Sequence, residues 1–279
     1  MEWHELFYGG EFTMTKDTKI QIGLCFLLII IAVLFAGCLD SKTTVIKPDC
    51  RSRDCGGYYW GERDSLGMYM LTITKPGEYT FLKNARFPSR IGIYVASSGV
   101  TLDGSGVTLT FIIGQPDLDL KNITIDDNSY FDASYSSGTA ITECRNIKNS
   151  SIHIAATSQV TGIENLYGTM DGTTSITVIS GVNSAYGVSI VDGTISGGTI
   201  TVRGGYQAYG VYRVNNTGTI SGGKYTVYGL MAAVGVGTNR GTISGGTFSM
   251  ASDYNVAYGV YEDFGTVSGA TFTVNGKSV

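Results

Sequence analysis

Charged residues and histidine are scarce in this chain of 279 residues. Asp, Glu, Lys and Arg together make up 15% of the sequence, against roughly 25% in typical soluble domains. The formal net charge is −4, and in the absence of a basic stripe we do not expect nucleic acid as a partner. The only histidines are His4 and His153. They supply too few ligands for a transition-metal site, so we predict no such cofactor.

Stretches that are apolar at helical spacing are missing from residues 141–274. In their place the phrase Gly193-Thr-Ile-Ser-Gly-Gly-Thr returns with small changes at Gly218, Gly241 and Gly265. The hydrophobic position of this phrase recurs at steps of 23 to 25 residues, at Ile147, Met170, Ile195, Ile220, Ile243 and Val267. A period this steady indicates stacked copies of one supersecondary unit.

Two further apolar columns keep the same period, so each repeat carries three short strands. Apolar residues in these strands alternate with Thr, Ser or Lys, which is typical of half-buried strands. Glycines between the strands supply positive φ for corners. The sequence therefore predicts an all-β fold, a single-stranded parallel β-helix of about 24 residues and three strands per coil, preceded by an N-terminal hydrophobic segment.

The first 38 residues predict export. We interpret residues 1–13 as a mis-assigned start, because Gly9-Gly-Glu can be encoded by a ribosome-binding sequence just before Met14; a genuine extension is the alternative. Residues 14–38 carry two lysines and then the uncharged run 20–38, as a signal peptide or membrane anchor does. Leu34-Phe-Ala-Gly-Cys38 resembles a lipobox, which would make Cys38 the lipid attachment site. An uncleaved helix and plain secretion remain alternatives, and all three place the body outside the membrane.

The next segments predict a linker and a cap. Residues 39–66 are polar and without periodicity, so we expect a linker. Cys50 and Cys55 lie within it, and in an oxidising compartment they favour a local disulfide over free thiols. Residues 67–90 alternate as strands of an N-terminal cap, and residues 91–279 form the β-helix. Because no amphipathic helix covers the final coil, we expect its edge to dock onto another envelope protein or a second copy.

Three short motifs carry a family resemblance. Lys75-Pro-Gly-Glu-Tyr, Gly92-Ile-Tyr-Val and Val100-Thr-Leu-Asp-Gly-Ser-Gly resemble the opening of right-handed parallel β-helix proteins of the pectin-lyase-like superfamily. The nearest type is the periplasmic copper-binding and carbohydrate-binding or sugar-hydrolase repeat of bacterial and archaeal surface proteins. The resemblance implies a right-handed coil and a cell-surface location. The copper association of that family has no ligand set in this sequence.

Acidic residues between positions 117 and 132 are the candidates for chemistry. The Gly-His-Gly motif of polygalacturonases is missing, but paired carboxylates can still act as acid and base. The candidate residues are Asp117, Asp119, Asp126, Asp127 and Asp132. Three interpretations stay open: a solvated loop, a weak calcium site, and the catalytic site of a polysaccharide lyase or glycoside hydrolase.

Tyrosine is the one side chain in surplus, with 18 copies. Tyr186, Tyr209 and Tyr258 share one repeat position and should stand on the outer face, either as a stabilising ladder or as a carbohydrate-binding surface. Asn122, Asn149 and Asn215 begin sequons that permit glycosylation. Together these features predict a cell-surface, membrane-tethered module with a structural, adhesive or polysaccharide-binding role.

Overall fold

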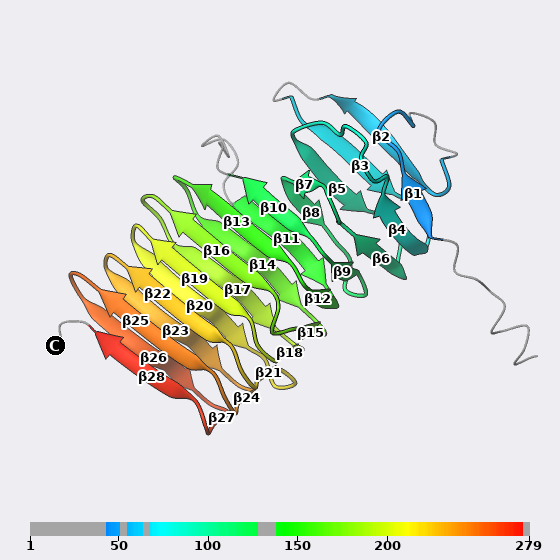
Figure 1. Cartoon of the computed structure of the whole chain (residues 1–279). Helices are drawn as coiled ribbons and strands as arrows, with labels where there is room; N and C mark the ends of the chain where they lie inside the picture. Colours follow the sequence, from blue (N-terminus) through cyan, green and yellow to red (C-terminus); the bar gives the residue numbers. More distant parts are fainter. Residues whose placement is uncertain (1–42, 51–54, 64–66, 128–137, 276–279) are drawn as a thin grey trace, which may run out of the picture. The chain divides into compact units, whose positions relative to one another are not determined.

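The computed structural model describes residues 43–50, 55–63, 67–127 and 138–275. By internal contacts the chain divides into Met1–Lys42, which lies outside the described residues, and one compact unit, Thr43–Val279. The described residues of this unit form 28 strands and no helix. They build three sheets, which we name A, B and C (Figure 1).

Sheets A and B each contain ten strands. The strands of sheet A are β1 (Thr44–Ile46), β4 (Gly77–Phe81), β6 (Val100–Asp103), β9 (Asp119–Lys121), β12 (Asn146–Lys148), β15 (Thr169–Met170), β18 (Thr194–Ile195), β21 (Thr219–Ile220), β24 (Thr242–Ile243) and β27 (Thr266–Val267). The strands of sheet B are β2 (Tyr58–Arg63), β3 (Tyr69–Ile73), β5 (Ile91–Val95), β8 (Phe111–Ile113), β11 (Gly138–Cys144), β14 (Val160–Leu166), β17 (Ala185–Val191), β20 (Gln207–Val214), β23 (Ala232–Asn239) and β26 (Val256–Asp263).

Sheet C contains eight strands: β7 (Thr108–Leu109), β10 (Thr124–Asp127), β13 (Ser151–Ala156), β16 (Ser175–Ser180), β19 (Thr199–Gly204), β22 (Lys224–Gly229), β25 (Thr247–Ser252) and β28 (Thr271–Asn275). From β11 onward the chain passes through sheets B, A and C in turn, and each strand pairs in parallel with its counterpart in the next coil. The protein is therefore a parallel β-solenoid with about 24 residues per coil and about eight turns, as the repeat predicted.

The predicted interior ladder is confirmed in register. Ile195 of β18 pairs with Ile220 of β21, which pairs with Ile243 of β24. All three side chains have no exposed surface. Because the repeat keeps equivalent residues above one another, each coil closes the core of its neighbour.

A column of inward-facing glycines completes this core. It runs through sheet B at Gly162, Gly187, Gly210, Gly235 and Gly259. A methyl group at Gly187 would contact Ile200 and lie 2.6 Å from the carbonyl oxygen of Gly210. Only glycine therefore fits where the strands of sheet B approach the apolar pairs of sheet C. A separate set serves the corners, where Gly198, Gly223 and Gly246 have φ of 91°, 102° and 104°.

Stacked aromatic rings fill the last coils. The rings of Tyr225 and Phe248 lie 4.1 Å apart with planes at 8°, and Phe272 continues the stack at 4.8 Å from Phe248. Tyr225 has no exposed surface, and its hydroxyl donates to the carbonyl oxygen of Gly222 at 3.2 Å. Burial raises the pKa of Tyr225 far above its usual value, so the phenol stays neutral in the core.

The N-terminal end departs from the expected linker. Residues 39–66 were predicted to be a linker, but in the described part of this range β1 joins sheet A and β2 joins sheet B. The strand β2 pairs antiparallel with β3, the only antiparallel pair among the described strands. Tyr58 and Trp60 of β2 are 2% and 7% exposed, so this strand covers the first coil.

The cap itself begins the solenoid. Strands β3 and β4, predicted as a separate cap, pair in parallel with β5 and β6. Cys50 and Cys55, between β1 and β2, form a disulfide. The predicted signal or anchor segment 14–38 and Cys38 lie outside the described residues, among which no helix is long and apolar enough to cross a membrane.

Candidate functional site

Tyrosines gather on the outer face of sheet B. Tyr186 of β17 and Tyr209 of β20 are in register on consecutive coils, with ring centroids 5.2 Å apart and planes at 8°. Tyr212 stands across both rings, at 5.5 Å and 84° from Tyr186 and at 5.3 Å and 88° from Tyr209. Stacked and edge-on contacts of this kind are the preferred geometries of aromatic pairs, so the three phenols support one another.

A second tyrosine pair continues this surface two coils after Tyr209. Tyr258 and Tyr261 of β26 meet edge to face at 5.1 Å and 70°. Val234 of β23 lies between Tyr209 and Tyr258 in register, and it is only 3% exposed although it is on the outer face. We name Tyr186, Tyr209, Tyr212, Tyr258 and Tyr261 the tyrosine cluster.

The chemistry of the tyrosine cluster is that of an amphipathic surface. Burial, followed by the electrostatic influence of neighbouring phenols that include Tyr261, raises the pKa of Tyr209. The phenol of Tyr209 therefore remains uncharged at neutral pH. Tyr212 is 37% and Tyr261 is 59% exposed, and Arg213 lies 5.9 Å from the ring centre of Tyr212. Such a surface offers apolar ring area together with hydroxyl donors.

Sequence reasoning identified the column of Tyr186, Tyr209 and Tyr258 but missed Tyr212 and Tyr261. The available signal was the phrase Tyr-Gly-Val-Tyr, which occurs at Tyr209 and again at Tyr258. The corresponding position in the preceding coil is Ser189, and in the coil between them it is Gly237. Because only two coils carry the second tyrosine, it does not stand out as a column.

The acidic candidates are distributed over different faces. Asp117 accepts a hydrogen bond from the backbone N–H of Gly99 at 2.7 Å, and Asp119 belongs to sheet A. Asp126 and Asp127 belong to β10 of sheet C. Asp127 is only 4% exposed, and Asp132 lies outside the described residues. The structure therefore does not bring the described aspartates together as one acid–base pair.

Two of these carboxylates, Asp119 and Asp126, have side-chain partners on the next coil. Asp119 receives two bonds from Arg145, one of them at 2.9 Å from Nε, and one from Asn146 at 2.8 Å. Burial acts to raise the pKa of Asp119, but these bonds outweigh it and the pKa lies below its usual value. Asp126 lies 3.2 Å from Nδ1 of His153 on the next coil. In the described part of the chain, no three His, Cys, Asp or Glu residues are placed to hold a metal ion.

The sequon asparagines contact neighbouring corners. Asn122 donates from Nδ2 to Asp103 at 3.0 Å and accepts at Oδ1 from Asn149 at 2.6 Å. Asn215 donates to Asp192 of the preceding coil at 2.7 Å. Asn122 and Asn149 have φ of 53° and 46°, a conformation that asparagine tolerates better than most residues. These side chains therefore fasten consecutive coils, a role that the sequon pattern did not indicate.

The last described coil differs from the others in exposure. Strands β26, β27 and β28 each end the order of their sheet. Their core-facing residues are partly uncovered, since Val267 is 38% and Val274 47% exposed. Equivalent positions in earlier coils, such as Ile243 and Met250, are 0% and 1% exposed. This coil thus presents both apolar side chains and open strand edges.

Comparison with known proteins does not assign this chain to a family. No protein-family model, no curated protein and no solved structure matches this chain. The parallel β-solenoid is established by the strand pairing itself.

Proposed function

We propose that this protein is a cell-surface, membrane-tethered β-solenoid that binds polysaccharide through the tyrosine cluster. The observation that carries the proposal is the packing of Tyr186, Tyr209 and Tyr212 into one supported group on an outer sheet face. Their hydroxyl groups and rings are held in place before any ligand arrives. Binding therefore costs little side-chain conformational entropy. Sugars present apolar C–H faces and hydroxyl groups, and an amphipathic phenol surface complements both.

The family resemblance supports the same assignment. The motifs at Lys75–Tyr79 and Val100–Gly106 resemble right-handed β-helix proteins of the pectin-lyase-like superfamily, many of which are surface proteins that contact carbohydrate. The uncharged run 20–38 and the lipobox-like ending at Cys38 support a tether on the outer side of the membrane. The tether would hold the solenoid where extracellular polysaccharide is available.

Binding to a glycan array tests the ligand surface. The full chain, solubilised in detergent micelles, should bind one or more neutral polysaccharides, and the double substitution Tyr209→Ala with Tyr212→Ala should reduce that affinity about tenfold or more. Tyr254→Ala is the matched control, because Tyr254 is 69% exposed and lies outside the tyrosine cluster. Equal binding by wild type and the double variant would contradict the proposal.

A turnover assay separates binding from catalysis. Reducing-sugar and unsaturated-uronide release should stay at background with any polysaccharide that binds. Release that disappears in Asp126→Ala and Asp127→Ala variants would instead establish the lyase or hydrolase alternative for the 117–132 region.

Lipid attachment is tested on the cysteine itself. The variant Cys38→Ala should lose the mass of a lipid at the mature N-terminus and should no longer partition with membranes as a lipoprotein. Cys25→Ala, within the same apolar run, should leave both properties unchanged. A peptide from residues 1–13, found by mass spectrometry of the unprocessed precursor, would show instead that these residues are translated.

A further inference from the structure

The N-terminal end of the solenoid differs from the rest of the chain in charge. Residues 43–90, which contain β1 to β4, carry eight Lys and Arg against five Asp and Glu, a net charge of +3. Residues 91–279 carry eight Lys and Arg against thirteen Asp and Glu, a net charge of −5. Because β1 and β2 end the strand orders of sheets A and B, the positive charge is concentrated at one end of the stack of coils.

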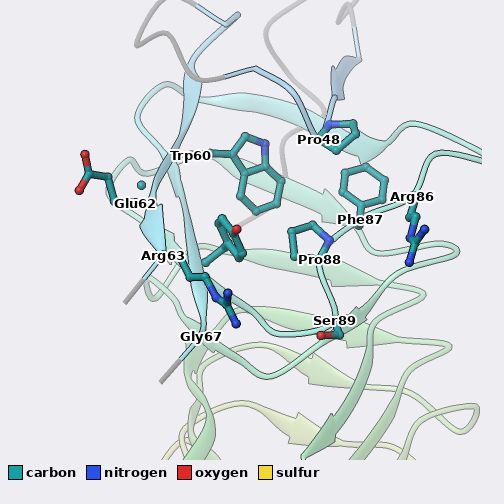
Figure 2. A pocket seen from close by; sticks show the side chains of 11 residues that line it. Pro48, Trp60, Glu62, Arg63, Gly67, Arg86, Phe87, Pro88 and Ser89 are labelled. Carbon is teal, nitrogen blue, oxygen red and sulfur yellow. The ribbon is translucent and has the colours of Figure 1, made fainter. Parts of the chain in front are cut away.

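A cavity of about 790 Å³ opens at this positive end. Its lining includes residues of β2, of β3 and of the segment 86–89 (Figure 2). Trp60 donates from Nε1 to the carbonyl oxygen of Lys47 at 2.7 Å, and Phe87 packs edge-on against the core residue Phe81 at 5.1 Å. The aromatic lining is therefore held in place by the protein itself. The volume falls within the roughly 300–1,000 Å³ typical of ligand sites.

Two guanidinium groups stand at the sides of the same cavity. In the view of Figure 2, Pro88 lies between Arg63 and Arg86. Both arginines are exposed, and neither takes part in the ion pairs of the described residues. Trp60 and Tyr69 belong to the same lining. Side chains of these three types are favoured at a membrane–water interface, because each joins an apolar body to a polar tip.

The length of the proposed tether keeps this end of the solenoid close to the membrane. Cys38, the expected lipid attachment site, precedes Thr44, the first residue of β1, by six residues. Six residues of fully extended chain span at most about 22 Å. The part of the solenoid that a tether at Cys38 brings within reach of lipid headgroups is therefore the part that carries the positive charge.

We propose that the N-terminal end of the solenoid docks onto the membrane surface, with phosphate groups of anionic phospholipids received by Arg63 and Arg86. This inference rests on the membrane tether of the proposed function. A guanidinium offers paired donors that match a phosphate in geometry and charge. The same surface repels the acidic coils of residues 91–279, so the docked solenoid points away from the membrane. Docking in this orientation leaves the tyrosine cluster accessible to polysaccharide.

Hydrogen exchange of the full chain in lipid nanodiscs, with one chain per disc, tests the docking. The segment 83–90 lies between β4 and β5 and contains no strand, so its amides can report on a bound headgroup. In discs of equal parts phosphatidylcholine and phosphatidylglycerol, this segment should exchange about fivefold more slowly, or slower still, than in discs of phosphatidylcholine alone. Raised salt should remove the difference, because it screens the attraction.

Two double variants assign the protection to the cavity. Arg63→Gln with Arg86→Gln should weaken docking about fivefold for each arginine and so remove the protection of residues 83–90. The control Arg203→Gln with Arg240→Gln deletes two exposed guanidinium groups from later coils and should keep it. All four side chains are exposed, so melting temperatures should match the wild type. Full protection in the cavity variant, or equal loss in the control, would overturn the inference.

Incorporation into the discs tests the tether separately from the docking. A wild-type chain that enters both kinds of disc but exchanges equally in them would refute docking and leave the tether standing. A chain that enters neither kind would remove the tether and this inference with it. Equal protection by inorganic phosphate added to phosphatidylcholine discs would reveal an anion site unrelated to lipid, which would also overturn the inference. Binding to the glycan array does not depend on any of these results.

Discussion

Asn149 donates its side-chain amide to Oδ1 of Asn122, the equivalent corner residue one coil earlier, at 2.6 Å. Asn122 in turn donates to Asp103. The two asparagines share the left-handed backbone conformation that turns the chain from sheet A towards sheet C. A polar ladder at the corner therefore complements the apolar ladders of the interior, and it uses the very residues that a sequon search selects.

Replacement of Asn122 should separate the two roles of this residue. Asn122→Gly keeps a backbone suited to positive φ but loses the side-chain bonds, whereas Asn122→Ala also strains the backbone by about 1 kcal/mol. We expect both variants to have a lower free energy of unfolding in urea than the wild type. Asn122→Ala should be the less stable of the two. The control Asn183→Ala changes an exposed asparagine with φ outside the positive range. Equal stability of Asn122→Ala and wild type would contradict the ladder.

Stability should fall in acid through three corner aspartates. Burial acts to raise the pKa of Asp103, Asp119 and Asp171, but hydrogen bonds outweigh it, and each pKa lies below 3.8. A depressed folded-state pKa contributes stability that is present above the unfolded value of 3.8 and is lost as pH falls through the folded value. The free energy of unfolding should therefore decline as pH is lowered below about 4.

Two variants test whether Asp119 contributes to this loss of stability in acid. Asp119→Asn should lower stability at neutral pH by at most about 1 kcal/mol, since the Arg145 pair is partly exposed, and should flatten the acid slope. Glu164→Gln, an exposed carboxylate without a hydrogen bond in the described residues, should keep the wild-type slope. Urea titrations between neutral pH and acid measure the stability and its slope against pH for both variants. An unchanged slope in Asp119→Asn would contradict a contribution of Asp119.

Two glycines allow a matched test of the core. An added methyl group at Gly187 points inward against Ile200 and the Gly210 carbonyl, whereas at Gly172 the nearest atom lies 4.0 Å away. Gly187→Ala should destabilise the protein by about 1–3 kcal/mol through overpacking. Gly172→Ala should be neutral or slightly stabilising, by less than about 1 kcal/mol. Comparable unfolding midpoints for the two variants would refute the inward placement of Gly187.

The last described coil should mediate association with a second copy of the chain. Partly exposed Val267 and Val274 and open strand edges favour such docking. Glu262 and Asp263 lie on the same coil, so added salt should strengthen the association by screening their repulsion. In sedimentation velocity, Val274→Lys should shift the chain towards monomer, whereas Val182→Lys, at a position 65% exposed, should not. A monomer at all concentrations and salt levels would dismiss this interface.

The repeated part of the fold could be predicted from sequence because every coil carries apolar residues at the same positions. Ile195, Ile220 and Ile243 recur at a fixed step, and their alternation with Thr and Ser indicates which face is buried. Strand β2 has no copy elsewhere in the chain, and its antiparallel pairing with β3 is made once. Tyr58 and Trp60 therefore gave no periodic signal, although they cover the first coil.

The candidate sites were only partly visible for a related reason. The shared repeat position of Tyr186 and Tyr209 predicted their common face, but the neighbouring Tyr212 became apparent only when the ring contacts were known. A cavity of about 790 Å³ is lined by Trp60 and Arg63 of β2 and by Arg86 and Phe87 of the segment after β4 (Figure 2), and no repeat in the sequence connects these two segments. Asp119 and Asp126 are seven residues apart, yet a corner places them on different sheets.

The strand β2 has a consequence for assembly. It runs antiparallel to β3, whereas β1 beside it runs parallel to β4. Head-to-tail stacking of two copies would therefore bring β2 against β26 in the antiparallel direction while β1 met β27 in parallel. The two end coils of the chain are for this reason not matched to each other as neighbouring coils within the chain are.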